Sequence, residues 1–79
     1  MKSKSTADER FLIKLYEMAL ATGDPLAVFD YRIVAKAIGQ KETAMKNIIK
    51  HLAQANFVKK VDDTKVHLTE QGCAFVLDI

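Results

Sequence analysis

The chain has 79 residues, of which 49% are apolar and 28% charged, a composition that suits one small globular domain and excludes a disordered chain. The net charge is only +2, and no run approaches the roughly 18 apolar residues of a membrane span. The basic N-terminus shows no signal-peptide pattern and the single Cys73 suits a reducing compartment, so we expect a cytoplasmic protein. We expect one domain over residues 1–79, with residues 1–5 disordered.

A helix is predicted over residues 7–22, with Ser5 or Thr6 as its cap. Glu9 follows Thr6 at the spacing of a capping box, in which the threonine hydroxyl and the glutamate carboxylate each accept a backbone N–H of the other residue. Gly23 is expected to end the helix, because glycine readily adopts the left-handed conformation that follows many helices. Five residues at helical spacing make one apolar face: Phe11, Leu12, Leu15, Met18 and Ala19.

The short apolar run over residues 26–29 predicts an extended segment or a brief strand. Asp30 is a favourable N-cap, so a second helix is expected over residues 31–38, and Gly39 then interrupts it. The residues of this helix expected to face the core are Ile33, Val34, Ala37 and Ile38.

A third helix is predicted over residues 42–55, only a few residues after Gly39. Its apolar stripe consists of Met45, Ile48, Ile49 and Leu52. Asn56 follows, and asparagine is second to glycine in adopting the left-handed conformation after a helix. Two helices joined by a tight turn that contains glycine are the signature of a helix-turn-helix motif.

Two β-prone runs, residues 57–61 and 66–68, flank a short polar turn and predict a β-hairpin. If Val61 pairs with Val66, the apolar side chains share one face of the hairpin. That face then holds Phe57, Val61, Val66 and Leu68, and the other face holds Lys60 and His67.

A last short helix is expected over residues 70–77, with Thr69 as its cap. Its packing residues are expected to be Phe75, Val76 and Leu77. The order of elements predicts an α+β fold that is mostly helical. It is the plan of a winged helix-turn-helix, in which three helices carry a β-hairpin wing and a short C-terminal helix follows.

Residues 38–58, which begin Ile38-Gly39-Gln40-Lys41-Glu42, resemble the turn and recognition helix of small bacterial winged-helix regulators of the multiple-antibiotic-resistance regulator type. Those proteins carry Leu-Gly, a short polar turn and a helix with apolar positions matching Met45, Ile49 and Leu52. Leu68-Thr69-Glu70-Gln71-Gly72 is similar to the Leu-Thr-x-x-Gly that follows their wing. The resemblance covers residues 30–72, and it implies a transcriptional regulator that binds double-stranded DNA.

The sequence departs from that pattern at two places. Asn56 stands where glycine is usual, which the left-handed region tolerates. The wing tip is Asp62-Asp63-Thr64-Lys65, whereas DNA-binding wings usually carry Arg or Lys at the tip. Two adjacent acids there would be repelled by DNA.

Positive charge gathers in residues 31–60, which hold seven basic residues and one acid, whereas the rest of the chain carries a net charge of −4. Segregated charge of this kind attracts an anionic partner, and we expect double-stranded DNA with the third helix in the major groove. The residues expected to contact DNA are Arg32, Lys36, Lys41, Thr43, Lys46, Asn47, Lys50, Lys59 and Lys60. Those expected to read base edges are Thr43, Lys46, Asn47 and Lys50, which share one helix face.

The alternative function is a protein-interaction module on the same fold, favoured by the acidic wing tip and the apolar end of the chain, Phe75-Val76-Leu77-Asp78-Ile79. The apolar residues at the end of the chain would also suit a homodimer, formed through the first or the last helix. An enzyme is not expected, because no nucleophile has a base at a suitable spacing. His51, His67 and Cys73 form no metal-ligand pattern, so no metal, cofactor or small-molecule substrate is expected.

Overall fold

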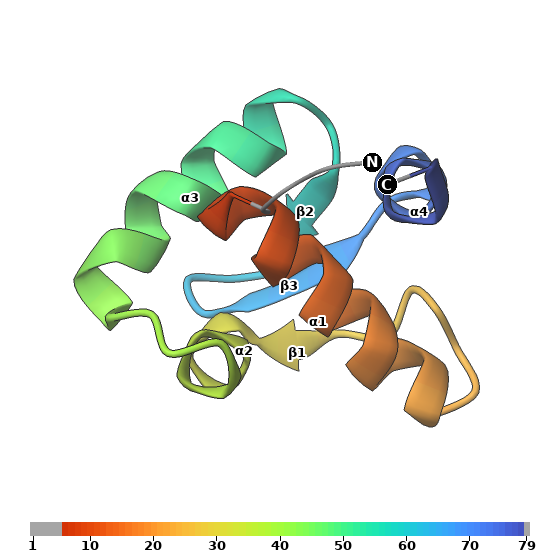
Figure 1. Ribbon diagram of the computed structural model, residues 1–79, viewed down its shortest axis with the longest axis horizontal. Coiled ribbons are helices and arrows are strands. Elements are labelled where there is room, and N and C mark those ends of the chain that lie inside the picture. Colours follow the sequence, from red (N-terminus) through yellow and green to blue (C-terminus); the bar gives the residue numbers. More distant parts are fainter. Residues whose placement is uncertain (1–5, 79) are drawn as a thin grey trace.

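Four helices and a three-stranded antiparallel sheet make up residues 6–78, the part of the chain that the computed structural model describes (Figure 1). The elements are α1 (Ala7–Ala21), β1 (Phe29–Asp30), α2 (Tyr31–Ala37), α3 (Glu42–Gln54), β2 (Val58–Lys60), β3 (Lys65–Leu68) and α4 (Glu70–Asp78). The predicted α+β class and the predicted order of elements are confirmed. The expectation that residues 1–5 are disordered lies outside the described residues.

The arrangement centres on α1, which contacts the other three helices and β3. The sheet has the order β1-β3-β2, so the two-residue strand β1 extends the hairpin formed by β2 and β3. In Figure 1, α2 and α3 lie on one side of the molecule and α4 lies on the other. The tip of the hairpin reaches the α2 side, and β2 of the hairpin contacts α3.

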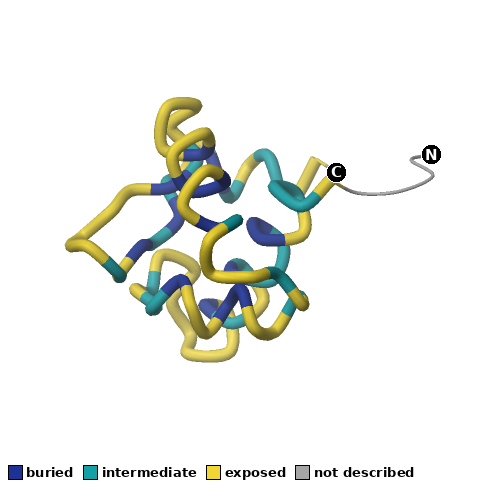
Figure 2. Tube along the Cα trace, turned by 90° about the vertical axis from the view of Figure 1, so that its left-hand side faces the viewer, coloured by how far each residue is buried: buried dark blue, intermediate teal, exposed yellow. Residues whose placement is uncertain are grey.

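The hydrophobic core forms where the helices meet the sheet, and the buried residues line the inside of the chain trace in Figure 2. All four residues of the predicted apolar stripe of α3 are buried. On α1, the predicted face is buried except for Met18, which is half-buried. Burial of each large side chain contributes roughly 1.5–3 kcal/mol to the free energy of folding. These two patterns are therefore confirmed, and α3 is anchored by one side while its opposite side is exposed.

The predicted helix ends are also confirmed by hydrogen bonds and backbone angles. The Glu9 N–H donates to Thr6 Oγ1 at 3.1 Å and the Thr6 N–H donates to Glu9 Oε1 at 3.2 Å, which completes the capping box. The Asp30 carboxylate accepts a backbone N–H from the first turn of α2. Gly23 and Asn56 have φ angles of 89° and 65°, so both adopt the left-handed conformation that ends a helix.

The inward face of α2 differs from the prediction. Ile33 and Ala37 were expected in the core but are exposed, whereas Tyr31 and Ala35 are buried beside Val34. The cause is tertiary packing: α2 contacts α1, α3 and β1, and the Tyr31 N–H donates to a carbonyl of the hairpin tip at 2.9 Å. These contacts set the rotation of a helix only seven residues long, and a local apolar pattern does not contain that information.

The predicted hairpin register is wrong by one residue. Val66 lies opposite Lys60 rather than Val61, and Val58 lies opposite Leu68. Paired residues share a face, so Val58 joins the two buried residues of β3 in the core. Val61 is 57% exposed, because a slip of one residue turns a side chain to the other face of the sheet.

The shifted register also exchanges the faces of the sheet on which the two lysines of β2 lie. Lys60 shares the face of Val66, whereas Lys59 lies opposite His67 on the other face, so the predicted pairing of Lys60 with His67 on one face is wrong. Phe57 precedes the strand and is half-buried, with its ring stacked on that of Phe75 at a centroid distance of 4.7 Å. This contact with α4 favours the observed register, because it leaves Val58 to enter the core.

Thr69 links the start of α4 to the end of α3. Its Oγ1 accepts the N–H of Gly72 at 2.9 Å, which confirms the predicted cap, and its hydroxyl donates to the carbonyl of Asn56 at 2.6 Å. The prediction that Leu77 packs on the domain is wrong, since it is 70% exposed in the last turn of α4. The other two predicted packing residues of α4 are half-buried.

Candidate functional site

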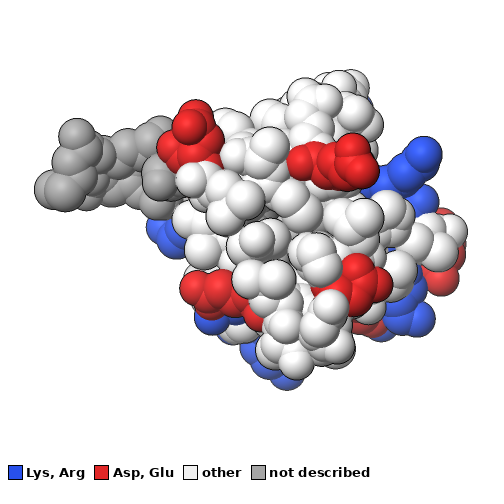
Figure 3. Space-filling model, turned by 90° about the vertical axis from the view of Figure 1, so that its right-hand side faces the viewer, with Lys and Arg blue, Asp and Glu red and all other residues white. Residues whose placement is uncertain are grey.

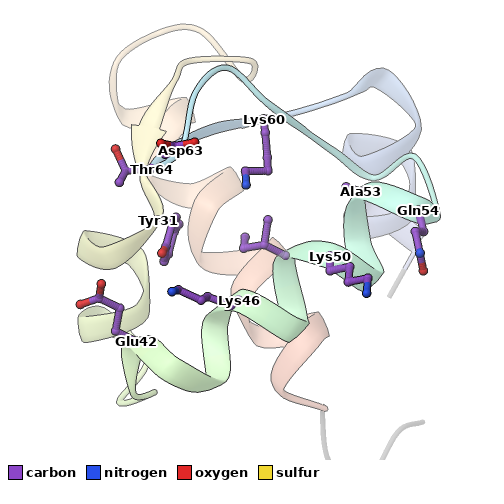
Figure 4. Close-up of a pocket in the computed structure, with 10 residues that line it drawn as sticks. Tyr31, Glu42, Lys46, Lys50, Ala53, Gln54, Lys60, Asp63 and Thr64 are labelled. Carbon is purple, nitrogen blue, oxygen red and sulfur yellow. The ribbon is translucent and has the colours of Figure 1, made fainter.

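An open groove of about 860 Å³ runs between α3 and the hairpin (Figure 4). Its walls come from α3 on one side and from β2 and the hairpin tip on the other, with the first residue of α2 at one end. The residues that line it are Tyr31, Glu42, Lys46, Ile49, Lys50, Ala53, Gln54, Lys60, Asp63 and Thr64. The groove therefore combines residues that lie more than thirty positions apart in the sequence.

Three lysines converge on this groove. Lys46 and Lys50 lie four residues apart on α3, so they occupy neighbouring turns of one helix face. Lys60 comes from β2, and Figure 4 shows its side chain extending toward α3. It reaches the groove because the observed register places it on the face of Val66. Three exposed ammonium groups around one open groove make a surface that attracts a chain of negative charges.

Apolar side chains form the base of the groove, and hydrogen bonds hold the hairpin tip over one end. Tyr31 is 5% exposed and Ile49 is 3% exposed, so both belong to the core and also line the groove. The Tyr31 N–H donates to the Thr64 carbonyl at 2.9 Å. Next to this bond, Asp30 pairs with Lys65 in the β1–β3 ladder. The hairpin tip is thus attached to α2 by the backbone.

Acidic residues occupy the Tyr31 end of the groove. Figure 4 shows Glu42 and Asp63 at this end, and Lys50 and Gln54 at the other. The groove is therefore polarised along its length, with carboxylates at the α2 end and basic side chains in the middle and at the far end.

The other tip acid, Asp62, is engaged within the turn. Its Oδ1 accepts the N–H groups of Thr64 and Lys65, each at 2.9 Å. These backbone hydrogen bonds lower the pKa of Asp62 below its ordinary value, because they stabilise the ionised carboxylate. The two adjacent acids of the predicted wing tip consequently have different environments, and of the pair only Asp63 lines the groove.

Arg32 forms an ion pair with Asp30, the residue that caps α2. Its Nη2 lies 2.6 Å from Asp30 Oδ2, and its Nε donates to Oδ1 at 3.0 Å. The hydrogen bonds from the Arg32 side chain and backbone lower the pKa of Asp30 to about 2, and the same pair raises the pKa of the guanidinium. Since Asp30 already holds the fork of Arg32, this residue offers less charge to an external anion than the sequence suggests.

The remaining predicted contact residues are exposed but spread over several elements. Thr43 and Asn47 lie on the exposed face of α3, beside Lys46 and Lys50. Lys36, Lys41 and Lys59 lie in the last turn of α2, at the N-cap position of α3 and on the far face of the hairpin, respectively. The structure thus brings together Lys46, Lys50 and Lys60 beside a polar helix face, and it does not bring Lys59 to that surface.

Sequence reasoning missed several groove residues. Gln54 follows Lys50 by four residues, so extending the spacing of the exposed α3 face by one turn would have found it. Tyr31, Asp63 and Thr64 have no such signal, because they meet α3 only through the packing of α2 on α3 and the position of the hairpin tip.

The opposite side of the molecule has a different surface. Figure 3 shows the α4 side, where most side chains are uncharged, acidic groups are scattered and Lys or Arg appear mainly at the margins. Large apolar side chains are exposed at the end of α1, in the loop after it and on α4: Leu20, Leu26, Val28 and Leu77. The basic groove and these apolar side chains therefore belong to different parts of the molecule.

Other reactive groups are sparse in residues 6–78. No cluster of three His, Cys, Asp or Glu side chains that could hold a metal ion occurs in this part of the chain. Cys73 is half-buried with its Sγ 4.0 Å from the Pro25 carbonyl, and desolvation raises the pKa of its thiol. None of the helices among these residues is long and apolar enough to cross a bilayer.

Comparison of the chain with protein-family models, with curated proteins and with solved structures gave no match. The groove and the exposed face of α3 are therefore the basis for a functional proposal.

Proposed function

We propose that this protein binds double-stranded DNA and that its fold works as a winged helix-turn-helix, with α2 and α3 as the helix pair and the hairpin as the wing. The observation that carries the proposal is the convergence of Lys46, Lys50 and Lys60 on the groove beside the exposed polar face of α3. The B-DNA major groove is about 12 Å wide and admits one α-helix. A phosphate backbone bordering that groove would then run between α3 and the hairpin.

The side chains of α3 divide into two roles under this proposal. Thr43 and Asn47 would face base edges, where asparagine forms a bidentate pair with adenine. Lys46 and Lys50 border the groove, so they would contact phosphates or the acceptor atoms of guanine. Lys60 would contact the same phosphate strand from the hairpin.

The biological role that fits such binding is transcriptional regulation in the cytoplasm. This part of the proposal rests on the resemblance of residues 30–72 to small bacterial regulators and on the lone thiol of Cys73, which suits a reducing compartment.

The test is the salt dependence of binding to a labelled duplex of random sequence, measured by fluorescence anisotropy. Three phosphate contacts predict a log–log slope of about −3 between about 50 and 200 mM salt. The double variant Lys46→Glu/Lys50→Glu should weaken binding roughly tenfold or more, because it reverses two of those charges. Absence of binding by the wild-type protein at low salt would contradict the proposal.

A matched control for the double variant reverses two basic charges of α1, Arg10→Glu/Lys14→Glu, which line a separate small hollow. It changes the net charge by the same amount but leaves the groove intact. Equal loss of affinity in both double variants would mean that net charge alone drives binding. Circular dichroism of each variant checks that the fold is retained.

The alternative function is a protein-interaction module, and the exposed apolar side chains on the α4 side favour it. The same side chains would serve a homodimer through α1 or α4. An apolar interface weakens little with salt, whereas DNA binding weakens steeply. Sedimentation velocity of the wild-type protein and of Leu77→Ser distinguishes self-association from a monomer.

A further inference from the structure

We propose that Asp63 lowers the affinity of the groove for any phosphate strand, so that a duplex is retained only where α3 adds base contacts. The inference rests on the proposed function of the groove. Discrimination between partners often uses a repulsive element as well as attractive contacts.

The first argument for this role is the position of Asp63 in the groove. Asp63 lines the same groove as Lys46 and Lys60, and Figure 4 shows it at the hairpin tip, at the Tyr31 end of the groove. It is exposed, and within residues 6–78 it forms no hydrogen bond or ion pair. Among these residues its carboxylate therefore has no partner of its own, and it faces whatever occupies the groove.

Asp62 shows that the turn needs only one of the two acids. The Asp62 carboxylate accepts the two backbone N–H groups that close the turn. Asp63 makes no such contact, so folding of the hairpin gives no reason for an acid at this position. A carboxylate that the turn does not use, in a groove with three lysines, is placed to act on a ligand of that groove.

The tip is held in place, which prevents Asp63 from moving away with its backbone. The Tyr31 N–H donates to the carbonyl of Thr64, the residue after Asp63. On the other side of the tip, the Val61 N–H donates to the Lys65 carbonyl at 2.8 Å. A phosphate strand running through the groove toward α2 would therefore approach a fixed negative charge.

The consequence is a groove that binds phosphates well only at its basic part. Non-specific duplexes depend almost entirely on phosphate contacts, so they have no other contacts that offset the repulsion. A duplex whose bases match the exposed face of α3 gains contacts that Asp63 does not affect.

The experiment measures binding of the full chain to a labelled random duplex, with wild type, Asp63→Asn, Asp63→Lys and Glu70→Gln compared at the same salt. Glu70 lies on α4 and is exposed, so Glu70→Gln changes the net charge by as much as Asp63→Asn does at the other side of the molecule. We expect Asp63→Asn to bind about threefold more tightly than wild type. Asp63→Lys should bind about tenfold more tightly, with a salt slope steeper by about 0.9. Glu70→Gln should stay close to wild type.

The outcomes separate the two proposals. If wild type binds and Asp63→Asn gains no more than Glu70→Gln, the role of Asp63 is overturned while DNA binding stands. If neither wild type nor the Asp63 variants bind at low salt, DNA binding fails and this inference fails with it. Binding by Asp63→Lys alone would overturn both proposals, because the added lysine then supplies a phosphate contact that the wild-type groove lacks. Thermal unfolding of each variant verifies that the exposed substitutions leave the fold intact.

Discussion

Gly72 shows how one residue can be required by a close approach rather than by a turn. It is buried in α4, and a Cβ atom at this position would overlap the Phe57 carbonyl oxygen and lie 3.2 Å from Leu68 Cδ2. The N–H of Gly72 donates to Thr69, whose own N–H donates to the same Phe57 carbonyl. The Leu-Thr-x-x-Gly pattern therefore has a structural reason: it lets α4 pack directly on the start of β2.

The substitution Gly72→Ala should lower the free energy of unfolding by about 2–3 kcal/mol, because backbone has to move to admit the methyl group. Urea denaturation followed by circular dichroism measures this change. Ala74→Gly, on the exposed side of the same helix, serves as the control and should cost about 1 kcal/mol through helix propensity alone. A Gly72→Ala protein as stable as wild type would mean that α4 sits farther from Phe57.

The sequence predicted the helix caps but not the ion pair at the start of α2. The roles of Thr6, Asp30 and Asn56 were predictable because a cap depends on residues within a few positions. The pairing of Arg32 with Asp30 was not predicted, although the two residues are close in sequence, because it depends on the side-chain rotamers. The charge of Arg32 was consequently counted as available to DNA.

At the scale of elements, α1 and α3 were predictable because each is long and has one apolar stripe. The short helix α2 and the hairpin were less predictable. The rotation of α2 and the register of the hairpin are set by contacts between distant residues, such as Tyr31 with Thr64 and Phe57 with Phe75. A one-residue error in the predicted register exchanged the sheet faces of Lys59 and Lys60. The candidate site therefore could not be assembled correctly from the sequence.

The ion pair of Asp30 with Arg32 at the start of α2 makes the stability of the fold sensitive to acid. The pKa of Asp30 is about 2 in the folded protein, against an ordinary value of 3.8. Because the folded-state pKa is the lower one, the ion pair stabilises the fold above pH 4 and this contribution is lost as the pH falls toward 2. Asn keeps the capping oxygen but cannot be protonated in this range.

Asp30→Asn should therefore be less stable than wild type near neutral pH, and the difference should shrink as the pH falls from about 4 to about 2. Urea denaturation of both proteins at several pH values measures the difference. Parallel stability curves over this range would show that Asp30 and Arg32 do not interact in solution.

At the scale of the whole molecule, the lysines of the groove and the largely uncharged α4 side occupy different parts of the surface. The groove between α3 and the hairpin carries Lys46, Lys50 and Lys60, whereas the α4 side in Figure 3 is largely uncharged or acidic. The sequence predicted the excess of positive charge in residues 31–60, since composition is local. Only the fold shows which of these charges meet, because Lys60 reaches α3 through the hairpin.

The central claim is that a DNA strand lies between α3 and the hairpin, and the neighbouring lysines of β2 test it most directly. Lys60 faces the groove and Lys59 faces the other side of the hairpin, so Lys60→Glu and Lys59→Glu make the same change of net charge at adjacent positions. The measurement is the affinity of each variant for a labelled random duplex over a range of salt concentrations. We expect Lys60→Glu to weaken binding and flatten the salt slope by about 1, while Lys59→Glu has a much smaller effect. Equal effects of the two substitutions, or a larger effect of Lys59→Glu, would contradict binding in the groove.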